Sequence, residues 1–305
     1  MIGNSSVASN LGRVGLWTRQ LDGVPGAAAQ DAVAEVEALG YGCVWIPEAV
    51  RREVISHATL LLAGSSRVVI ATGIARVHAR AAQAAALAQV LLDDRFPGRF
   101  VLGLGVSHQI VVERMMGQHY GKPLDVMSSY LDAVDVTLHA AQDSAGDATH
   151  HRVIAALGPK MMALAAARAG GAHTYMAPVE HTRWARSVLG PGAMLAPAVK
   201  VVLDTNLVRA GEIARSSIGP TLRTPAYSGN LGRFGYSEDE IGRDPSDRVV
   251  DALVCCGDVA AIVARVREHL DAGADHVCVE VLTGDDTTVP LAAWRELAPA
   301  LTTLG

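Results

Sequence analysis

Three side chains that can move a proton each follow a short apolar run: Glu48, His78 and His108. A half-buried Glu48 beside an aromatic ring would have a raised pKa and could hold or move a proton near neutral pH. Alternatively, Glu48 begins the next loop and helix, or pairs with Arg51 or Arg52. His108 can donate to a ligand oxygen or act as an acid, and the alternative is an exposed residue in a first helical turn. His78 is either a second such group or a polar surface residue.

A phosphate site is predicted at Gly158-Pro159-Lys160. Glycine before a helix presents free backbone N–H groups and the positive end of the helix dipole, and Lys160 adds an ammonium group. The alternative is a plain strand-to-helix connection with proline at the first helical position. Tyr175 and Met176 end the next predicted strand, and we expect them to line the pocket.

No pattern indicates a metal site or a hydrolytic nucleophile. The four cysteines, Cys43, Cys255, Cys256 and Cys278, lack CxxC spacing, and we expect the adjacent pair to be small buried residues at a helix end. This cysteine usage favours a reduced, cytoplasmic protein. Neither a G-x-S-x-G motif nor a Ser-His-Asp pattern is present, so hydrolysis has little support.

The elements that must position these groups alternate between strand and helix along the chain. We expect eight strands, at Arg13–Trp17, Cys43–Ile46, Val68–Thr72, Phe100–Gly105, Val153–Leu157, His173–Met176, Ala198–Asp204 and His276–Leu282. This alternation predicts an α/β fold, a single (β/α)8 TIM barrel, in which function sits on the loops that follow the strands. An open doubly wound sheet is the alternative, but no G-x-G-x-x-G follows the first strand.

We expect residues 1–305 to form one domain with an irregular insertion at 220–247, before the last strand. A connection of this length either covers the pocket or forms part of a subunit interface. Its expected contact residues are Tyr227, Arg233 and Tyr236.

Composition excludes several classes of partner. The net charge is −5 with 19% charged residues, which leaves no basic face for nucleic acid or an anionic membrane. No apolar run reaches the roughly 18 residues of a membrane span. The expected partners are therefore a small-molecule substrate and, by analogy with similar barrels, a second copy in a homodimer.

The glycine-broken strand ends resemble the luciferase-like monooxygenase superfamily, TIM barrels that bind FMN or the deazaflavin coenzyme F420. The similarity lies in the segments LGRVGLWT, VWIPEA, ATGI, DDRFPGRFVLGLGVSH and AALGPKMMALAAARAGGAHTYMAP, and in a second block that ends in DAGADHVCVEVL. It is greatest to actinobacterial F420-dependent oxidoreductases and spans essentially the whole chain.

The resemblance implies roles for particular residues. Gly73-Ile74 would form a bulge, often a cis peptide, behind the central ring of the cofactor. Gly105, Val106 and Ser107 would line the ring or its ribityl chain. The resemblance further implies that Gly158, Pro159 and Lys160 hold the phosphate end, flanked by Tyr175 and Met176. By their positions after the strands, we expect Trp17, His78 and Tyr120 to contact the substrate.

One departure from the family pattern affects the chemistry. Relatives that oxidise a sugar phosphate or secondary alcohols carry an Asp-His pair after the second strand, whereas this chain has Glu48 and Ala49. The proton acceptor of those relatives is therefore absent, and another group must replace it. By loop position, the nearest candidates are His108, His78 and Tyr120.

The resulting hypothesis is an oxidoreductase that transfers a hydride between F420 and a small carbonyl compound, alcohol or activated alkene, with His108 or Glu48 as the catalytic residue. An FMN-dependent monooxygenase is the first alternative. The second is a barrel that binds a flavin or deazaflavin without catalysis.

Overall fold

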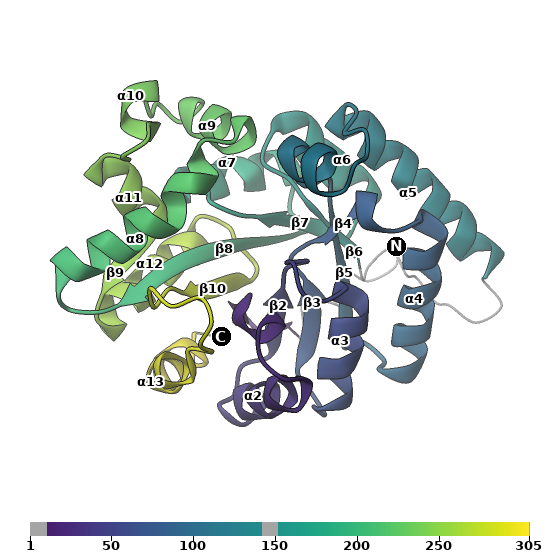
Figure 1. The fold of residues 1–305 in the computed structure, drawn as a ribbon, viewed down its shortest axis with the longest axis horizontal. Coiled ribbons are helices and arrows are strands. Elements are labelled where there is room, and N and C mark those ends of the chain that lie inside the picture. The colour runs from purple at the N-terminus through teal and green to yellow at the C-terminus, as the bar shows by residue number, and fades with distance from the viewer. Residues whose placement is uncertain (1–10, 142–151, 305) are drawn as a thin grey trace.

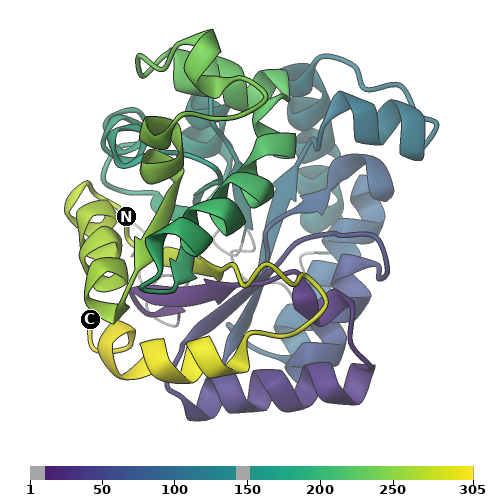
Figure 2. The ribbon, with the colours of Figure 1, turned by 60° about the vertical axis from the view of Figure 1, so that its left-hand side comes forward.

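The computed structural model describes residues 11–141 and 152–304, and shows the predicted parallel barrel (Figures 1 and 2). Eight strands close the barrel: β1 (Val14–Trp17), β2 (Cys43–Ile46), β3 (Val69–Thr72), β5 (Phe100–Gly105), β6 (Arg152–Ala155), β7 (Gly171–Thr174), β8 (Met194–Leu203) and β10 (Val277–Val281). Each overlaps a predicted strand. The TIM-barrel prediction is confirmed, and the open-sheet alternative is wrong, because β10 pairs with both β1 and β8.

The strand β8 is longer at its start than predicted. It begins at Met194 rather than Ala198, because residues 194–197 pair in register with β7. The prediction began after Pro197, which usually marks the end of a strand. In the structure Pro197 lies opposite Thr174 within the ladder.

Helices cover the outside of the barrel (Figure 2). They are α2 (Gly26–Ala38), α3 (Val54–Ala63), α4 (Ala82–Arg95), α5 (Pro123–Ala140), α6 (Pro159–Arg168), α7 (Val179–Leu189), α8 (Leu207–Leu222), α12 (Val259–Asp271) and α13 (Leu291–Leu301). Short 3-10 turns lie at Gln20–Asp22 and Val77–Ala79, and a π-helical turn lies at Val111–Met115. The last helix, α13, lies beside the first, α2, where Arg295 and Glu35 form an ion pair.

The segment before the last strand is more regular than predicted. Residues 220–247 contain α9 (Pro225–Gly232) and α10 (Glu238–Ile241), and they are followed by α11 (Asp247–Leu253) and the strand β9 (Val254–Gly257). The helices α9 and α10 are too short to show an amphipathic period in the sequence, but a capping box between Ser237 and Glu240 fixes the start of α10. Cys255 and Cys256 lie on β9, which pairs with β8, so their prediction as helix-end residues is wrong.

The third strand is interrupted at Gly73-Ile74. Residues on either side pair with β5: β3 before the break and the two-residue strand β4 (Ala75–Arg76) after it. The peptide bond between Gly73 and Ile74 is cis, as the resemblance implied. Just before the break, the Thr72 hydroxyl both donates to the Gly103 carbonyl and accepts from the Gly103 N–H, each at 2.8 Å.

Gly103 has no room for a side chain, because a Cβ built there would lie 1.9 Å from the Thr72 carbonyl oxygen. We expect Gly103→Ala to lower the free energy of unfolding by about 3 kcal/mol or more, since the barrel backbone must shift. Urea denaturation measures this. Gly232→Ala is the control, because its Cβ meets nothing within 4 Å, and we expect a change within about 1 kcal/mol. Equal stability of the two variants would contradict the account.

Candidate functional site

A cavity of about 600 Å³ opens where the barrel strands end. The last residue of β1 and the loops after β2, β3, β5, β6 and β7 contribute to its wall, and α9 adds further lining residues. The lining residues are Trp17, Pro47, Glu48, Gly73, Ile74, Arg76, Gly105, Val106, Ser107, His108, Tyr120, Pro123, Ala155, Ala156, Leu157, Gly158, Pro159, Met161, His173, Tyr175, Ala226, Tyr227, Gly229, Asn230 and Arg233. Most of the residues that the sequence analysis selected therefore lie in one pocket.

Gly73 and Ile74, the break between β3 and β4, form a ridge in the pocket wall. Three hydrogen bonds to Trp17, Ile46 and Glu48 hold this Gly73-Ile74 ridge in place. The Gly73 N–H donates to the Ile46 carbonyl at 2.8 Å, and the indole Nε1 of Trp17 donates to the Gly73 carbonyl at 3.1 Å. The Glu48 N–H donates to the Ile74 carbonyl at 3.1 Å. A Cβ at Gly105 would lie 2.5 Å from the Ile74 side chain, so glycine there lets Ile74 pack against β5.

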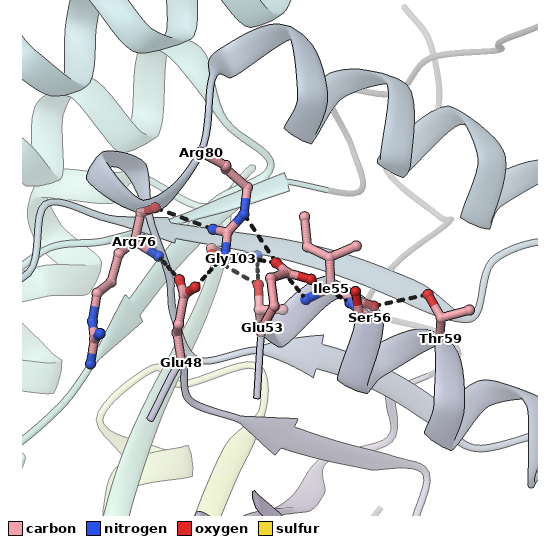
Figure 3. A network of polar contacts seen from close by, with 9 residues as sticks. Glu48, Glu53, Ile55, Ser56, Thr59, Arg76, Arg80 and Gly103 are labelled. Atoms are coloured by element: carbon pink, nitrogen blue, oxygen red, sulfur yellow. Dashed lines mark hydrogen bonds and ion pairs between the residues drawn. The ribbon is translucent and has the colours of Figure 1, made fainter. Parts of the chain in front are cut away.

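Glu48 is tied to protein groups through both carboxylate oxygens (Figure 3). Oε2 accepts from the Arg76 N–H at 2.6 Å, and Oε1 pairs with the Arg80 guanidinium. Arg80 also pairs with Glu53 at 2.7 Å. The Glu48 and Arg80 side chains are only 8% and 9% exposed. The arrangement shows Glu48 fixing β4 rather than offering a free carboxylate to a ligand.

The expected alternative partners of Glu48 bind elsewhere. The guanidinium of Arg51 donates to the Gly23 carbonyl at 3.1 Å, and that of Arg52 donates to the Leu21 carbonyl at 2.8 Å. The ion pair of Glu48 is instead made by Arg80, 32 residues further along the chain.

Four aromatic rings follow one another along the pocket. The ring centroids are 5.2 Å apart for Trp17 and Tyr175, 6.2 Å for Tyr175 and Tyr227, and 5.4 Å for Tyr227 and His108. Tyr227 comes from α9, so the segment before the last strand does contribute to this wall. Such a row offers a broad apolar surface to a flat ligand.

Tyr175 is also held from inside the barrel. Its hydroxyl donates to Glu280 Oε1 at 3.4 Å, and Glu280 pairs with Lys200 at 2.8 Å. The Lys200 ammonium lies 4.8 Å from the centre of the Tyr175 ring. Burial and the nearby carboxylate raise the pKa of Tyr175, so its hydroxyl stays protonated and fixed.

His108 is the pocket group best suited to proton transfer. Its imidazole is half-buried, and no described residue forms a hydrogen bond with the ring. Burial lowers the pKa of His108, and the positive charge of Arg76 lowers it further. The ring is therefore neutral near pH 7 and can accept a proton.

His173, which sequence reasoning did not select as a site residue, lies at the base of the pocket. It stacks on Trp45, with 4.6 Å between ring centroids, and its Nδ1–H donates to the Ala196 carbonyl at 2.8 Å. Nε2 therefore carries a lone pair, and it has no hydrogen-bond partner among the described residues. Burial lowers the pKa of His173 to about 4. Its place in a predicted strand was the only signal in the sequence.

Three selected residues do not line the pocket. Lys160 is exposed at the start of α6, and Met176 is buried in a core cluster with Tyr227. His78 lies behind Tyr120, with its ring stacked at 5.8 Å and its Nε2 donating to the Tyr120 carbonyl at 3.2 Å. Tyr120 itself lines the pocket, and its hydroxyl donates to the Ser107 carbonyl at 3.0 Å.

Arginines, rather than lysines, bring positive charge to the pocket. Arg233 lines it near α6 and donates to the Leu157 carbonyl at 2.6 Å, while its guanidinium covers Trp184 at 4.8 Å. Of the other two insertion residues expected to make contacts, Tyr227 lines the pocket and Tyr236 is buried under Arg248.

Within residues 11–141 and 152–304, no cluster of His, Cys, Asp and Glu has the arrangement of a metal site. In the same ranges, no helix combines the length and the apolar character needed to cross a bilayer.

Glu48→Gln tests whether this residue is structural. We expect the free energy of unfolding to fall by about 1–3 kcal/mol, because the variant removes the buried ion pair with Arg80. Thermal and urea denaturation measure the loss. Glu113→Gln, at an exposed position, should be neutral. A fully stable Glu48→Gln protein would show that the ion pair does not support the fold.

The pKa of His108 can be measured directly by NMR titration of its ring proton, assigned with His108→Gln. We expect a midpoint below 6.5, because burial and Arg76 disfavour the imidazolium. Arg76→Gln should raise that midpoint, since it removes a positive charge, whereas Arg67→Gln, remote from the pocket, should not. A midpoint above 6.5 in the unmodified protein would contradict the predicted neutral state.

The comparisons with known proteins agree with this architecture. The profile described as Luciferase-like monooxygenase matches residues 11–194. A Mycobacterium tuberculosis (strain ATCC 25618 / H37Rv) protein, provisionally named a coenzyme F420-dependent oxidoreductase, is 33% identical over 122 residues. That match covers 40% of this chain and only 34% of the relative.

Solved structures show the same fold at low sequence identity. An F420-dependent secondary alcohol dehydrogenase, in complex with an F420-acetone adduct, superposes with a TM-score of 0.72 at 14% identity, over 95% of this chain and 98% of that one. The F420-dependent tetrahydromethanopterin reductase of Methanopyrus kandleri gives 0.71 at 15% identity, over 94% and 98%. The oxygenating constituent of 3,6-diketocamphane monooxygenase from Pseudomonas putida, in complex with FMN, gives 0.68 at 14%, over 96% and 98%.

The barrel, its interrupted third strand and the profile match over more than half of the chain agree with one another. They indicate an enzyme. The chain belongs to the luciferase-like monooxygenase family.

Proposed function

We propose that this protein is an oxidoreductase that transfers a hydride between coenzyme F420 and a small carbonyl compound, alcohol or activated alkene. The observation that carries the proposal is the pocket itself, which is lined by the Gly73-Ile74 ridge and by a row of aromatic rings that ends at a neutral His108. The F420-dependent relative and the two F420-dependent structural neighbours support this choice of cofactor.

The residues present fit a deazaflavin. In our proposal the ring lies against Gly73 and Ile74, with Gly105, Val106 and Ser107 along the ring or its ribityl chain. The phosphate end lies at the start of α6, where Gly158 and Pro159 precede free helical N–H groups and the helix dipole favours an anion. Arg233 supplies the positive charge expected of Lys160, because Arg233 lines the pocket and Lys160 does not.

The bound deazaflavin would supply hydride acceptance and donation, and the protein supplies orientation and one proton. We assign the proton to His108, whose neutral imidazole accepts it from a substrate hydroxyl during oxidation and returns it during reduction. Glu48 is not needed for this step, since its carboxylate is engaged by Arg76 and Arg80. In this proposal His108 replaces the histidine that some relatives carry at the position of Ala49.

A monooxygenase that uses FMN is the second candidate. It is favoured by the structural likeness to the FMN-bound diketocamphane monooxygenase constituent, over 96% of this chain. In that case the same ridge supports a flavin, and the apolar pocket excludes water from the oxygen-activating step.

Cofactor binding decides between the two. We expect oxidised F420 to bind with a micromolar or lower Kd, measured by its fluorescence, and FMN to bind at least tenfold more weakly. Gly105→Val should weaken binding of F420, because its side chain meets Ile74 in the ring site. Gly232→Ala is the matched control. Tight FMN binding without F420 binding, or oxygen consumption dependent on reduced FMN, would favour the monooxygenase.

The role of His108 is tested in the same preparation with a panel of small secondary alcohols, ketones and enones. We expect His108→Gln to slow turnover by roughly 10²–10⁴-fold with little change in the Kd for F420. Unchanged turnover in His108→Gln would overturn its assignment as the proton carrier. If the native protein binds F420 but turns over none of these compounds, that result would favour a barrel that binds the cofactor without catalysis.

A further inference from the structure

Arg76 differs from the other pocket arginine in having no acceptor for its side chain. It lies on β4, directly after the ridge, and is half-buried in the wall of the cavity. Among the described residues, no carboxylate or carbonyl oxygen accepts from its guanidinium. In Figure 3 the Arg76 side chain extends away from the carboxylate of Glu48.

The backbone of Arg76, by contrast, is fully engaged. Its N–H donates to Glu48 at 2.6 Å, and its carbonyl accepts from the Arg80 guanidinium at 3.2 Å. The main chain at this position is thus fixed without any help from the Arg76 side chain. The guanidinium is placed by a rigid support and is free to bind a ligand.

The charges around Arg76 leave it uncompensated. Glu48, the only carboxylate in the pocket wall described, is neutralised by Arg80. His108 is neutral near pH 7, and Arg233 donates to the Leu157 carbonyl and to Asn230. A half-buried cation without a counter-ion is costly, and an anion that enters the pocket would offset that cost.

We propose that Arg76 binds an anionic oxygen group of the ligand next to His108, so that the pocket selects for anionic partners. Guanidinium groups bind carboxylates through two parallel hydrogen bonds, which also fixes the orientation of the bound molecule. This inference rests on the proposed function in placing the reacting centre beside His108. The anionic oxygen comes either from a substrate carboxylate or from the ionised ring system of the deazaflavin.

The first test uses benzoate and its neutral counterpart benzamide as probes of the unloaded protein, with Kd measured by calorimetry. We expect benzoate to bind more tightly than benzamide, and Arg76→Gln to weaken benzoate binding about tenfold or more while leaving benzamide unchanged. Arg76→Lys keeps the charge and should retain part of the preference. Arg67→Gln is the matched control, because Arg67 has a 75% exposed side chain outside the pocket.

The second test distinguishes the two sources of the anion. The ionisation of bound F420 is followed by its absorbance as a function of pH, in the native protein and in Arg76→Gln. If the ring is the anion, Arg76→Gln shifts that ionisation to higher pH and benzoate competes with F420. If the substrate carries the anion, the ring ionisation is unchanged and benzoate binds to the F420-loaded protein.

The outcomes separate this inference from the proposed function. Benzoate selectivity that depends on Arg76, in a protein that does not bind F420, would support the anion site and overturn the cofactor assignment. Equal affinities for benzoate and benzamide, or equal affinities in native and Arg76→Gln proteins, together with an unshifted ring ionisation, would overturn the anion site.

Discussion

The hydrogen bonds that hold the break between β3 and β4 fix the Gly73-Ile74 ridge and the start of Arg76, on which the proposed ligand site depends. Gly73 is bound from one side by Ile46 and from the other by Trp17, and Glu48 binds the residues that follow. Trp17 ends β1, Ile46 ends β2 and Glu48 follows β2, and these strands pair in the order β1, β2, β3. The ridge is therefore held by the ends of two strands and by the loop that follows the second of them.

Glu48 shows how one buried carboxylate organises charge in this pocket. Its carboxylate accepts a hydrogen bond from the main chain of Arg76 and forms an ion pair with Arg80, so its negative charge is balanced by Arg80 and not by the Arg76 side chain. The side chain of Arg76 is then the group left without an acceptor among the described residues. Because His108 is kept neutral by burial and by that same cation, a base and a positive charge line the same pocket. This pairing suits a ligand that brings both a proton and a negative charge.

The aromatic wall joins parts of the chain that are far apart in sequence. Trp17 is the last residue of β1, Tyr175 follows β7, and Tyr227 lies on α9 in the segment before the last strand. A buried Lys200–Glu280 pair from β8 and β10 fixes the Tyr175 hydroxyl. Five elements thus determine one surface, which explains why a family with a common barrel can vary its ligands through residues on different loops.

The sequence by itself determined the alternation of strands and helices, the barrel, and most residues of the pocket, including Gly73, Gly105 and His108. Short apolar runs ending in glycine identify strands, and in a parallel barrel the carboxyl ends of all strands meet at one rim. A residue's position directly after a strand is therefore enough to predict that it lies at that rim. Only the tertiary structure decided what each side chain does there. The ion-pair partner of Glu48 is Arg80, 32 residues further along the chain, and Lys160 is exposed although Gly158 and Pro159 beside it line the pocket. The availability of His173 and Arg76 likewise depends on which acceptors lie nearby in space, and sequence spacing carries no information about those distances.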